Sequence, residues 1–210
     1  NFTIVHHNSI HTHQNIILKF MSIQNNQNNP DVLNCLANLS NDEIFTPTKL
    51  ATQILDTLPK KIWSNPNIKF LDPCSKTGIF LREIANRLNN GLKDVIKNDK
   101  KRSEHIFLKQ IYGISITELT ALISRRSIYY SKNVLGKNSI CAKFPNKEGN
   151  IYYKVISHSW NKKDECNHCG AKRIVYDRNE ENENYAYPFL HNENLFKNMK
   201  FDVIIGNPPY

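Results

Sequence analysis

The last four residues, Asn207-Pro208-Pro209-Tyr210, combine groups that could hold an amino group and present it for reaction. The Asn207 amide both donates and accepts hydrogen bonds, and the Pro208 carbonyl, fixed by the adjacent rings, adds a second acceptor. Two acceptors could grip an –NH₂ group and leave its nitrogen lone pair aimed at an electrophile. Tyr210 offers a flat face on which a planar base could stack. The plainer alternative is a proline-rich turn that contains an asparagine by chance.

A second polar segment, Asp72-Pro73-Cys74-Ser75-Lys76-Thr77-Gly78, follows a short apolar run. A carboxylate at the end of a strand, followed by a tight turn into a helix, presents backbone N–H groups to the polar end of a ligand. An ordinary strand-to-helix loop has the same pattern. By itself this segment therefore leaves both interpretations open.

The third candidate is Cys166-x-x-Cys169, which supplies half of the four ligands of a closed structural zinc site. The surrounding segment is polar and has few apolar residues with which to hold itself together, so a metal ion would suit it as an organiser. Two free cysteines in a turn are the alternative. The other ligands that we expect are a thiol and an imidazole, Cys141 and His158, with His168 or His191 as substitutes.

The elements that must position these residues alternate along the chain. Apolar runs predict strands at Ile68–Leu71, Ile111–Ile114 and Phe201–Ile205, and a helical pattern follows each of the first two. This alternation predicts an α/β fold with a parallel sheet joined by right-handed crossovers. Ligands bind at the carboxyl ends of strands in such sheets, so the loop after the last strand lies at the functional edge.

The expected helices carry recognisable start and stop signals. Thr46 as N-cap and Pro47 at the first helical position open a helix that Pro59 ends. Asn89-Asn90-Gly91 stops the helix after the first strand. In the helix over 117–130, the apolar residues able to share one face are Leu119, Leu122, Ile123 and Tyr130.

The chain divides into an N-terminal arm and one main domain. Residues 1–40 are rich in Asn, His and Gln, and such a tract buries too little apolar surface to offset its ordering entropy. Residues 41–210 form the α/β domain. The segment from about 137 to 195 interrupts its alternation of strands and helices and contains a CxxC and an acidic tract. We expect an inserted subdomain there, before the final strand.

Composition narrows the environment and the partners. The net charge of +9 favours a polyanionic partner, most simply nucleic acid. The charge is spread in short clusters, which do not indicate recognition of a particular nucleotide sequence. Five cysteines, an odd number, argue against a disulfide-stapled secreted domain. The longest apolar run near the N-terminus, Ile16–Leu18, is too short for a signal segment or a membrane span. We expect a cytoplasmic location.

Three segments together resemble the S-adenosylmethionine-dependent N6-adenine DNA methyltransferases. "FDVIIGNPPY" resembles their catalytic motif, Phe45-Thr46-Pro47 a cofactor-contacting motif, and "FLDPCSKTGIFLREIA" the cofactor motif Asp-Pro-Ala-Cys-Gly-Ser-Gly. The match follows the gamma order of that family over residues 41–210. It implies a Rossmann-like methyltransferase sheet, incomplete here, with a small zinc-binding-like insert. The insert further resembles a branch found in restriction–modification methylases.

The resemblance also implies roles for the matching residues. Within the catalytic motif, Asn207 and the Pro208 carbonyl would bind the adenine N6 amino group, and Tyr210 would stack on the base once it is flipped out of the duplex. The reaction would be a direct methyl transfer, accelerated mainly by positioning, without a general base of strongly shifted pKa. Phe45, Thr46 and Pro47 would line the cofactor pocket, and Asp72 would act at its centre. Pro73 and Gly78 would shape the turn around the methionine moiety of the cofactor.

Two positions depart from the pattern of the family. Lys76 stands at the first glycine of the cofactor motif, so the loop approaches the cofactor less closely or with a different charge. Ser115 stands where many members carry an acidic residue for the ribose hydroxyls. Glu118 is the nearest substitute, and it could equally be a capping residue of the helix that it starts.

These features together predict an adenine-specific methyltransferase of a bacterial-type restriction–modification system, acting on double-stranded DNA. Its further partner would be a cognate restriction endonuclease, fused or separate. An N5-glutamine methyltransferase acting on a protein is one alternative, because that chemistry also uses an Asn-Pro-Pro-Tyr grip. A non-catalytic fragment that binds zinc or nucleic acid is the other.

The position of the motif at the end of the chain leads to one more expectation. Members of the family need further strands and a target-recognition region after this loop. A sheet of about three strands would leave an exposed apolar edge. We therefore expect an incomplete fragment that transfers little or no methyl by itself.

Overall fold

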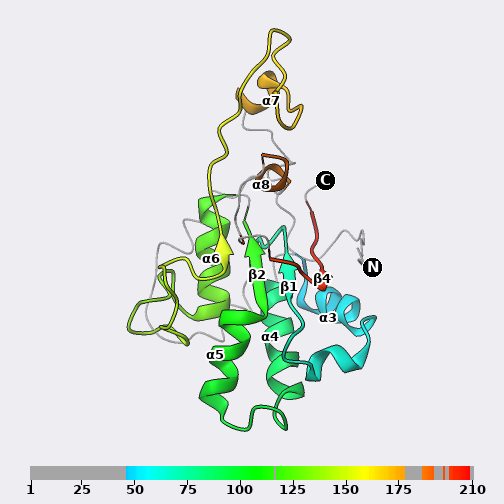
Figure 1. Ribbon diagram of the computed structural model, residues 1–210, viewed down its shortest axis with the longest axis vertical. Coiled ribbons are helices and arrows are strands. Elements are labelled where there is room, and N and C mark those ends of the chain that lie inside the picture. The colour runs from blue at the N-terminus through cyan, green and yellow to red at the C-terminus, as the bar shows by residue number, and fades with distance from the viewer. Residues whose placement is uncertain (1–45, 116, 178–185, 192–195, 197–198, 209–210) are drawn as a thin grey trace.

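The computed structural model describes residues 46–115, 117–177, 186–191, 196 and 199–208. The predicted arm over 1–40 lies outside these residues. Figure 1 shows the described helices and strands. In chain order they are α3 (Thr48–Asp56), the 3₁₀ helix η1 (Lys60–Ser64), β1 (Phe70–Asp72), α4 (Ile79–Gly91), α5 (Asp99–Lys109), β2 (Ile111–Ile114), α6 (Glu118–Tyr129), β3 (Ile151–Tyr152), α7 (Arg173–Asp177), α8 (Tyr187–Leu190) and β4 (Val203–Ile204).

The described strands form one parallel sheet in the order β3-β2-β1-β4. Phe70 in β1 is in register with Ile111 in β2 on one side and with Val203 in β4 on the other. Every residue of β1 and β2 is buried, as expected for parallel strands covered on both faces. The predicted α/β class with a parallel sheet is therefore confirmed.

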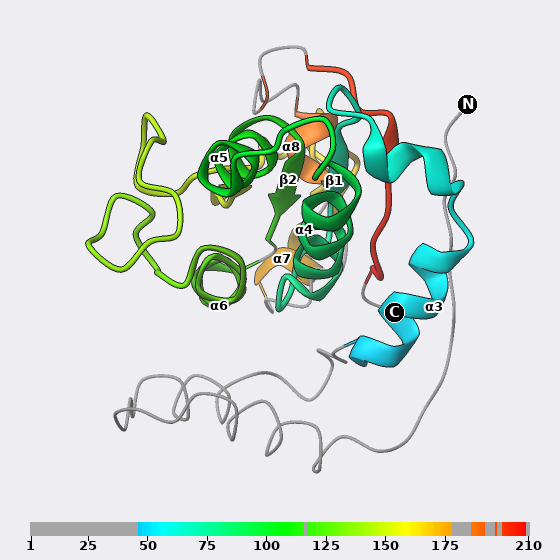
Figure 2. The same cartoon turned by 90° about the horizontal axis from the view of Figure 1, so that it is seen from below.

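Two different kinds of structure cover the faces of this sheet. Helices α4, α5 and α6 pack along one face and contribute most of the main core (Figure 2). On the other face, Leu71, Tyr112 and Ile114 pack against the segment that leads into β4. The Tyr112 ring meets Phe196 and Phe201 edge-on, at centroid distances of 5.6 and 5.3 Å. The last strand is thus held by aromatic packing as well as by its backbone.

The strand order creates a reversal point between β1 and β4. The chain moves outward from β1 to β2 and β3, and then returns to the opposite side of β1 as β4. In open α/β sheets, ligands bind beyond the carboxyl ends of the strands at such a switch point. The fold therefore directs attention to Asp72, at the end of β1, and to the residues after β4.

Helix α6 packs with a different face from the one predicted. Tyr130 is 60% exposed, and the fully buried positions of α6 are instead Thr120, Ala121, Ser124, Arg125, Ile128 and Tyr129. Ser124 shows the reason, because its Oγ lies 2.8 Å from Oγ of Ser75 in the turn after β1. Small hydroxyl side chains let α6 approach this turn closely, and an apolar stripe of leucines would hold it away.

The basic segment between α4 and β2, for which no element was predicted, forms helix α5. Asn98 caps this helix by accepting a 2.9 Å hydrogen bond from the Lys101 N–H. Arg102 is only 3% exposed and bonds Asp99 Oδ1 at 2.6 Å and Asn89 Oδ1 at 2.8 Å. The exposed charges hide an apolar stripe that contains Ile106, which is why the helical pattern was missed.

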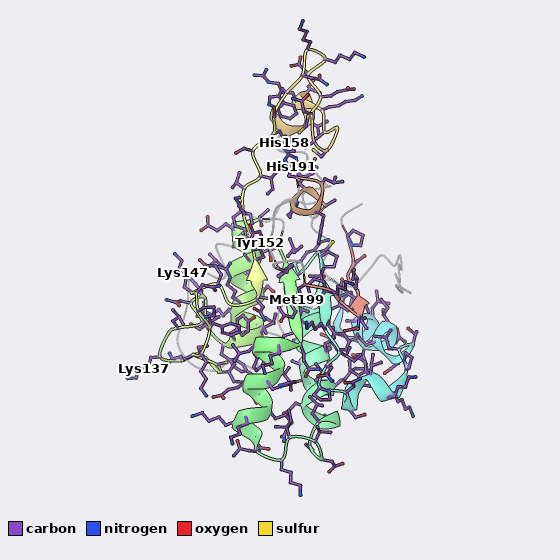
Figure 3. All side chains as sticks on the ribbon, viewed as in Figure 1. Lys137, Lys147, Tyr152, His158, His191 and Met199 are labelled. Carbon is purple, nitrogen blue, oxygen red and sulfur yellow. The ribbon has the colours of Figure 1, made fainter. Side chains whose placement is uncertain are left out.

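The predicted insert over 137–195 begins too early. Cys141 and Phe144 are buried in the main core, and Ile151 opens β3, which pairs with β2. Figure 3 accordingly places Lys137 and Lys147 beside the main body. The described sheet therefore has four strands where about three were expected, and the insert starts after Tyr152.

The insert projects beyond the edge toward which the strands point (Figure 1). Among its described residues are two isolated antiparallel bridges, Trp160 with Cys166 and Glu165 with Lys172, together with the short helices α7 and α8. No helix among the described residues is long and apolar enough to cross a membrane.

Candidate active site

A hollow at the switch point is formed by three segments that are far apart in the sequence. It is lined by Thr46 before α3, by residues of the Asp72–Phe80 turn, and by Asn207 after β4. Its empty volume, which includes space open to solvent, is about 220 Å³. The hollow lies where ligands bind in open α/β sheets.

The predicted role of Thr46 as the helix N-cap is wrong. Helix α3 begins at Thr48, Pro47 holds the N-cap position in an extended conformation, and no side chain caps the helix. The Thr46 hydroxyl instead accepts a 3.1 Å hydrogen bond from Nδ2 of Asn207.

This hydrogen bond fixes the orientation of the Asn207 amide. With Nδ2 committed to Thr46, Oδ1 is left as the acceptor for a ligand. That oxygen is buried and has no hydrogen-bond partner within the part of the chain that the structure describes. A buried, unpaired acceptor costs about 1–3 kcal/mol. A ligand N–H donor that entered the hollow would remove this cost.

Asp72 lies across the hollow from Asn207 and is 2% exposed. Its Oδ1 accepts a 3.0 Å hydrogen bond from the Cys74 N–H. Burial raises the pKa of Asp72 to about 7, although the Cys74 N–H and the charge of Lys76 both act to lower it. The site therefore contains a carboxyl group that is poised between its two protonation states near neutral pH.

Gly206 has to be a glycine because β4 passes so close to Asp72. A Cβ at Gly206 would lie 2.6 Å from Asp72 Oδ1 and 3.3 Å from Cδ of Pro73. The sequence analysis treated this glycine only as the end of a strand. The useful signal was its position directly before the Asn-Pro-Pro-Tyr motif, at an edge where backbone and ligand groups must approach each other closely.

The turn after β1 is tied to the neighbouring strand and helix. The Ser75 N–H donates to the Ile114 carbonyl at 2.8 Å, and the Ser115 hydroxyl donates to the Ser75 carbonyl at 3.2 Å. Ser115, at the position where an acidic residue was expected, therefore anchors the turn. Lys76, the other departure from the family pattern, is 6% exposed and lines the hollow.

Gly78 lets the turn lie against α6. It has a positive φ of 72°, and a Cβ there would lie 2.7 Å from Ser124 Oγ. An L side chain would meet both a strained backbone and an occupied space at this position. The predicted shaping role of Gly78 thus has a physical basis in the packing of the turn on α6.

The remaining predicted residues are placed as follows. Glu118 is exposed at the start of α6, and the capping alternative is wrong, because Thr117 and Thr120 form the capping box. Pro208 is half-buried beside Asn207. The residues of the predicted site that lie outside the described residues are Phe45, Pro209 and Tyr210.

The thiols and imidazoles of the insert gather in one place, but not with the predicted partner. Cys141 is 3% exposed in the main core, where Phe144 and Tyr129 also lie. The side chains whose ligand atoms all lie within 4.8 Å of one another are His158, Cys166, Cys169 and His191. His191, named from the sequence only as a substitute, thus stands where Cys141 was expected.

Part of the chain is similar to a known family of proteins. Residues 109–210 match the profile of the Eco57I restriction-modification methylase family. The matched methylase segment includes β2, α6, β3, the insert and Asn207, whereas Thr46 and Asp72 lie outside it. The fold brings these two residues to the matched segment.

A similar protein carries a description that names a base. A protein of Mycoplasma pneumoniae, described as an uncharacterized adenine-specific methylase, is 39% identical over 205 residues, covering 86% of this chain and 49% of that protein. The chain therefore spans about half the length of this curated relative. No solved structure matches the chain. The resemblance to adenine methyltransferases, drawn from the three sequence motifs, is confirmed.

Proposed function

We propose that this chain forms the cofactor-binding and amino-group-binding part of a restriction–modification enzyme that methylates adenine N6 in double-stranded DNA. The observation that carries this proposal is the Asn207 amide at the switch point, with its donor bound by Thr46 and its acceptor buried and unpaired. The family and the relative named above support modification of adenine. They favour DNA over the protein glutamine alternative.

The residues after β1 fit the amino-acid end of S-adenosylmethionine. That end carries an ammonium and a carboxylate, and the site offers the carboxyl group of Asp72 together with the buried cation of Lys76. Gly78 keeps the turn compact enough to remain on α6 while it contacts a ligand. When bound, S-adenosylmethionine supplies a methyl group on a sulfonium centre, which an amine lone pair can attack.

The chemical role of Asn207 is to orient that amine. Its Oδ1 would accept one N–H of the adenine amino group and the Pro208 carbonyl would accept the other, so that the lone pair points away from both. Methyl transfer to N6 would break the methyl–sulfur bond of the sulfonium and leave a neutral thioether, and the positive charge gained by N6 would lie beside these two oxygen acceptors. The nitrogen then loses one proton to water. Positioning accounts for most of the rate.

Further assignments complete the proposal. Glu118 would bind the ribose hydroxyls, Phe45 would line the cofactor pocket, and Tyr210, held by the rigid Pro208-Pro209 pair, would stack on the flipped base. We also propose a cytoplasmic location and a structural zinc ion in the insert. A cognate restriction endonuclease stays a prediction.

The proposal is tested first by calorimetric titration of the chain with S-adenosylmethionine. We expect saturable binding that is lost in Asp72→Asn. A matched control is Asp202→Asn, because Asp202 is exposed at the start of β4, where its Oδ2 accepts a bond from the Lys69 N–H at the opposite edge of the sheet. A folded chain that does not bind the cofactor contradicts the proposal.

The amino-group half of the site needs a separate readout. N6-methyladenine formed in duplex DNA can be measured by mass spectrometry after incubation with the chain and S-adenosylmethionine. We expect Asn207→Ala to remove whatever transfer the chain supports while it leaves cofactor binding intact. Transfer that persists in Asn207→Ala would show that another group presents the amine.

A further inference from the structure

The insert has little apolar packing with which to hold its shape. Several of its large apolar side chains face solvent, with Val155 63% exposed, Ile174 58% and Phe189 49%. Only a few, such as Ile156 and Tyr187, are buried. A segment with so small a core usually depends on a covalent or metal cross-link. Cys166 and Cys169 are not joined in a disulfide in the structure, so a metal ion is the remaining candidate cross-link.

The spacing of the clustered side chains suits a tetrahedral zinc ion. Cys169 Sγ lies 3.4 Å from Nδ1 of His158, and Cys166 Sγ lies 3.7 Å from Nε2 of His191. Zinc bonds of about 2.3 Å to sulfur and 2.0–2.1 Å to nitrogen give a tetrahedron whose edges are roughly 3.3–3.8 Å long. Both distances fall on such edges, so an ion would fit with small movements.

The surroundings of the cluster orient its members. The His158 ring stacks on Trp160 at a centroid distance of 5.1 Å and meets Tyr187 edge-on at 4.6 Å. The His168 N–H points to Cys166 Sγ at 3.5 Å, and Gly170, with a φ of 73°, closes the turn by donating to the Cys166 carbonyl. Metal ligands typically have such outer contacts, which fix ring and sulfur orientation.

We infer that His158, Cys166, Cys169 and His191 form a closed structural zinc site that joins the two ends of the insert. His158 lies on the outgoing segment after β3, the two cysteines lie in the hairpin, and His191 lies on the returning segment after α8. Figure 3 shows His158 and His191 close together, away from Tyr152 at the sheet. The site has four protein ligands and no open position, so its role is structural.

The test is metal analysis of the purified chain, made without cofactor or DNA, so that its result is independent of methyl transfer. We expect about one zinc ion per chain, as for a single four-ligand site. Cys166→Ser and His191→Gln should lose most of the zinc during dialysis. His168→Gln is the matched control, because His168 is an exposed histidine between the two cysteines and outside the cluster, and it should retain the metal.

A second readout covers variants that fail to fold. Cobalt(II) added to the metal-free, otherwise unaltered chain should give the intense visible bands of a tetrahedral site and a thiolate charge-transfer band. Hydrogen exchange should show loss of protection in residues 153–177 on metal removal, with α4 and β2 still protected.

Several results would overturn the inference. One is a folded, metal-free chain that does not take up cobalt, and another is a Cys166–Cys169 disulfide in the chain as isolated. A third is loss of zinc in Cys141→Ala combined with full retention in His191→Gln, which would restore the ligand set first expected from the sequence.

Discussion

At the scale of single residues, the candidate site rests on two side chains in energetically costly states. Asp72 is a buried carboxyl group whose pKa is raised to about 7, and Asn207 carries a buried acceptor with no partner among the described residues. Groups held in such states by the surrounding fold are frequent at functional sites. In both cases a cationic or N–H-bearing ligand would relieve the cost.

The raised pKa of Asp72 leads to a prediction about stability and pH. The folded chain holds the Asp72 proton up to about pH 7, whereas the ordinary value is 3.8, so the free energy of unfolding should fall as pH rises between these values and level off above. Asp72→Asn removes this titration. The free energy of unfolding of the variant, relative to that of the wild type, should therefore rise by a few kcal/mol from pH 4 to pH 8. Each unit of pKa shift corresponds to about 1.4 kcal/mol.

Urea unfolding of both proteins across this pH range measures the effect. Asp202→Asn serves as the control, because Asp202 is exposed at the opposite edge of the sheet and should show no comparable rise. Parallel stability curves for wild type and Asp72→Asn would contradict the assignment of Asp72 as a buried group with a raised pKa.

At the scale of elements, the sequence predicted the helices and strands whose signals lie within their own contiguous residues. β2 has the predicted bounds, and α4 ends at Gly91 as the Asn-Asn-Gly signal indicated. Helix α5 was missed because its charged residues outnumber its apolar residues. Strand β3 was missed because a strand of two residues is too short to show an alternating pattern. The packed face of α6 could not be predicted, since it depends on a turn more than forty residues earlier, whose Ser75 contacts Ser124.

The candidate site shows the same division between local and distant information. The polar turn and the final motif were both found, because each is a contiguous run of unusual residues. The Thr46–Asn207 hydrogen bond was not predicted, because it joins positions 161 residues apart. The fourth member of the His/Cys cluster was misjudged for the same reason, because Cys141 and His191 both lie 25 positions from Cys166 and sequence distance does not separate them.

The contact between the turn and α6 gives a prediction at this scale. Gly78→Ala should destabilise the chain through both its positive φ and the 2.7 Å approach to Ser124 Oγ. Gly170→Ala shares the positive φ but has nothing within 4 Å of the added Cβ, so it should cost only the backbone term of about 1–2 kcal/mol. We expect Gly78→Ala to cost about 1–3 kcal/mol more.

A double-mutant cycle separates the two contributions at Gly78. Adding Ser124→Ala to Gly78→Ala should recover part of the loss, because it removes the atom that the new Cβ meets. Denaturant unfolding of the four proteins gives the coupling energy. Equal costs at Gly78 and Gly170, together with no coupling to Ser124, would show that the turn and α6 do not constrain each other.

At the scale of the whole molecule, the insert and the candidate site share one edge of the sheet. The insert projects in the direction in which β2 and β3 point, and Asp72 and Asn207 follow strands that end at the same edge (Figure 1). The insert also carries exposed lysines, Lys162, Lys163 and Lys172. These three lysines place positive charge at the edge where the proposed DNA substrate would have to lie, although the acidic tract of the insert offsets their charge overall.

Salt dependence of DNA binding tests this placement. Lys162→Gln/Lys163→Gln should weaken duplex binding and lower the slope of log affinity against log salt, by about one for each phosphate contact removed. Lys60→Gln/Lys61→Gln is the matched pair, because these exposed lysines lie in η1 before β1, at the other edge. Similar losses in both pairs, measured by fluorescence anisotropy, would assign binding to overall charge alone.

The adjacency of β1 and β4 also bears on how the chain reaches its native state. Lys69 and Asp202, which bond across the start of these strands, are 133 positions apart, while β1 and β2 are separated only by α4 and α5. Closing so long a loop costs entropy before any contact compensates for it, and such pairings slow folding. We expect β4 to dock last, so that Asn207 meets Thr46 and Asp72 only at the final step. The affinity for the cofactor would then report directly on completion of folding.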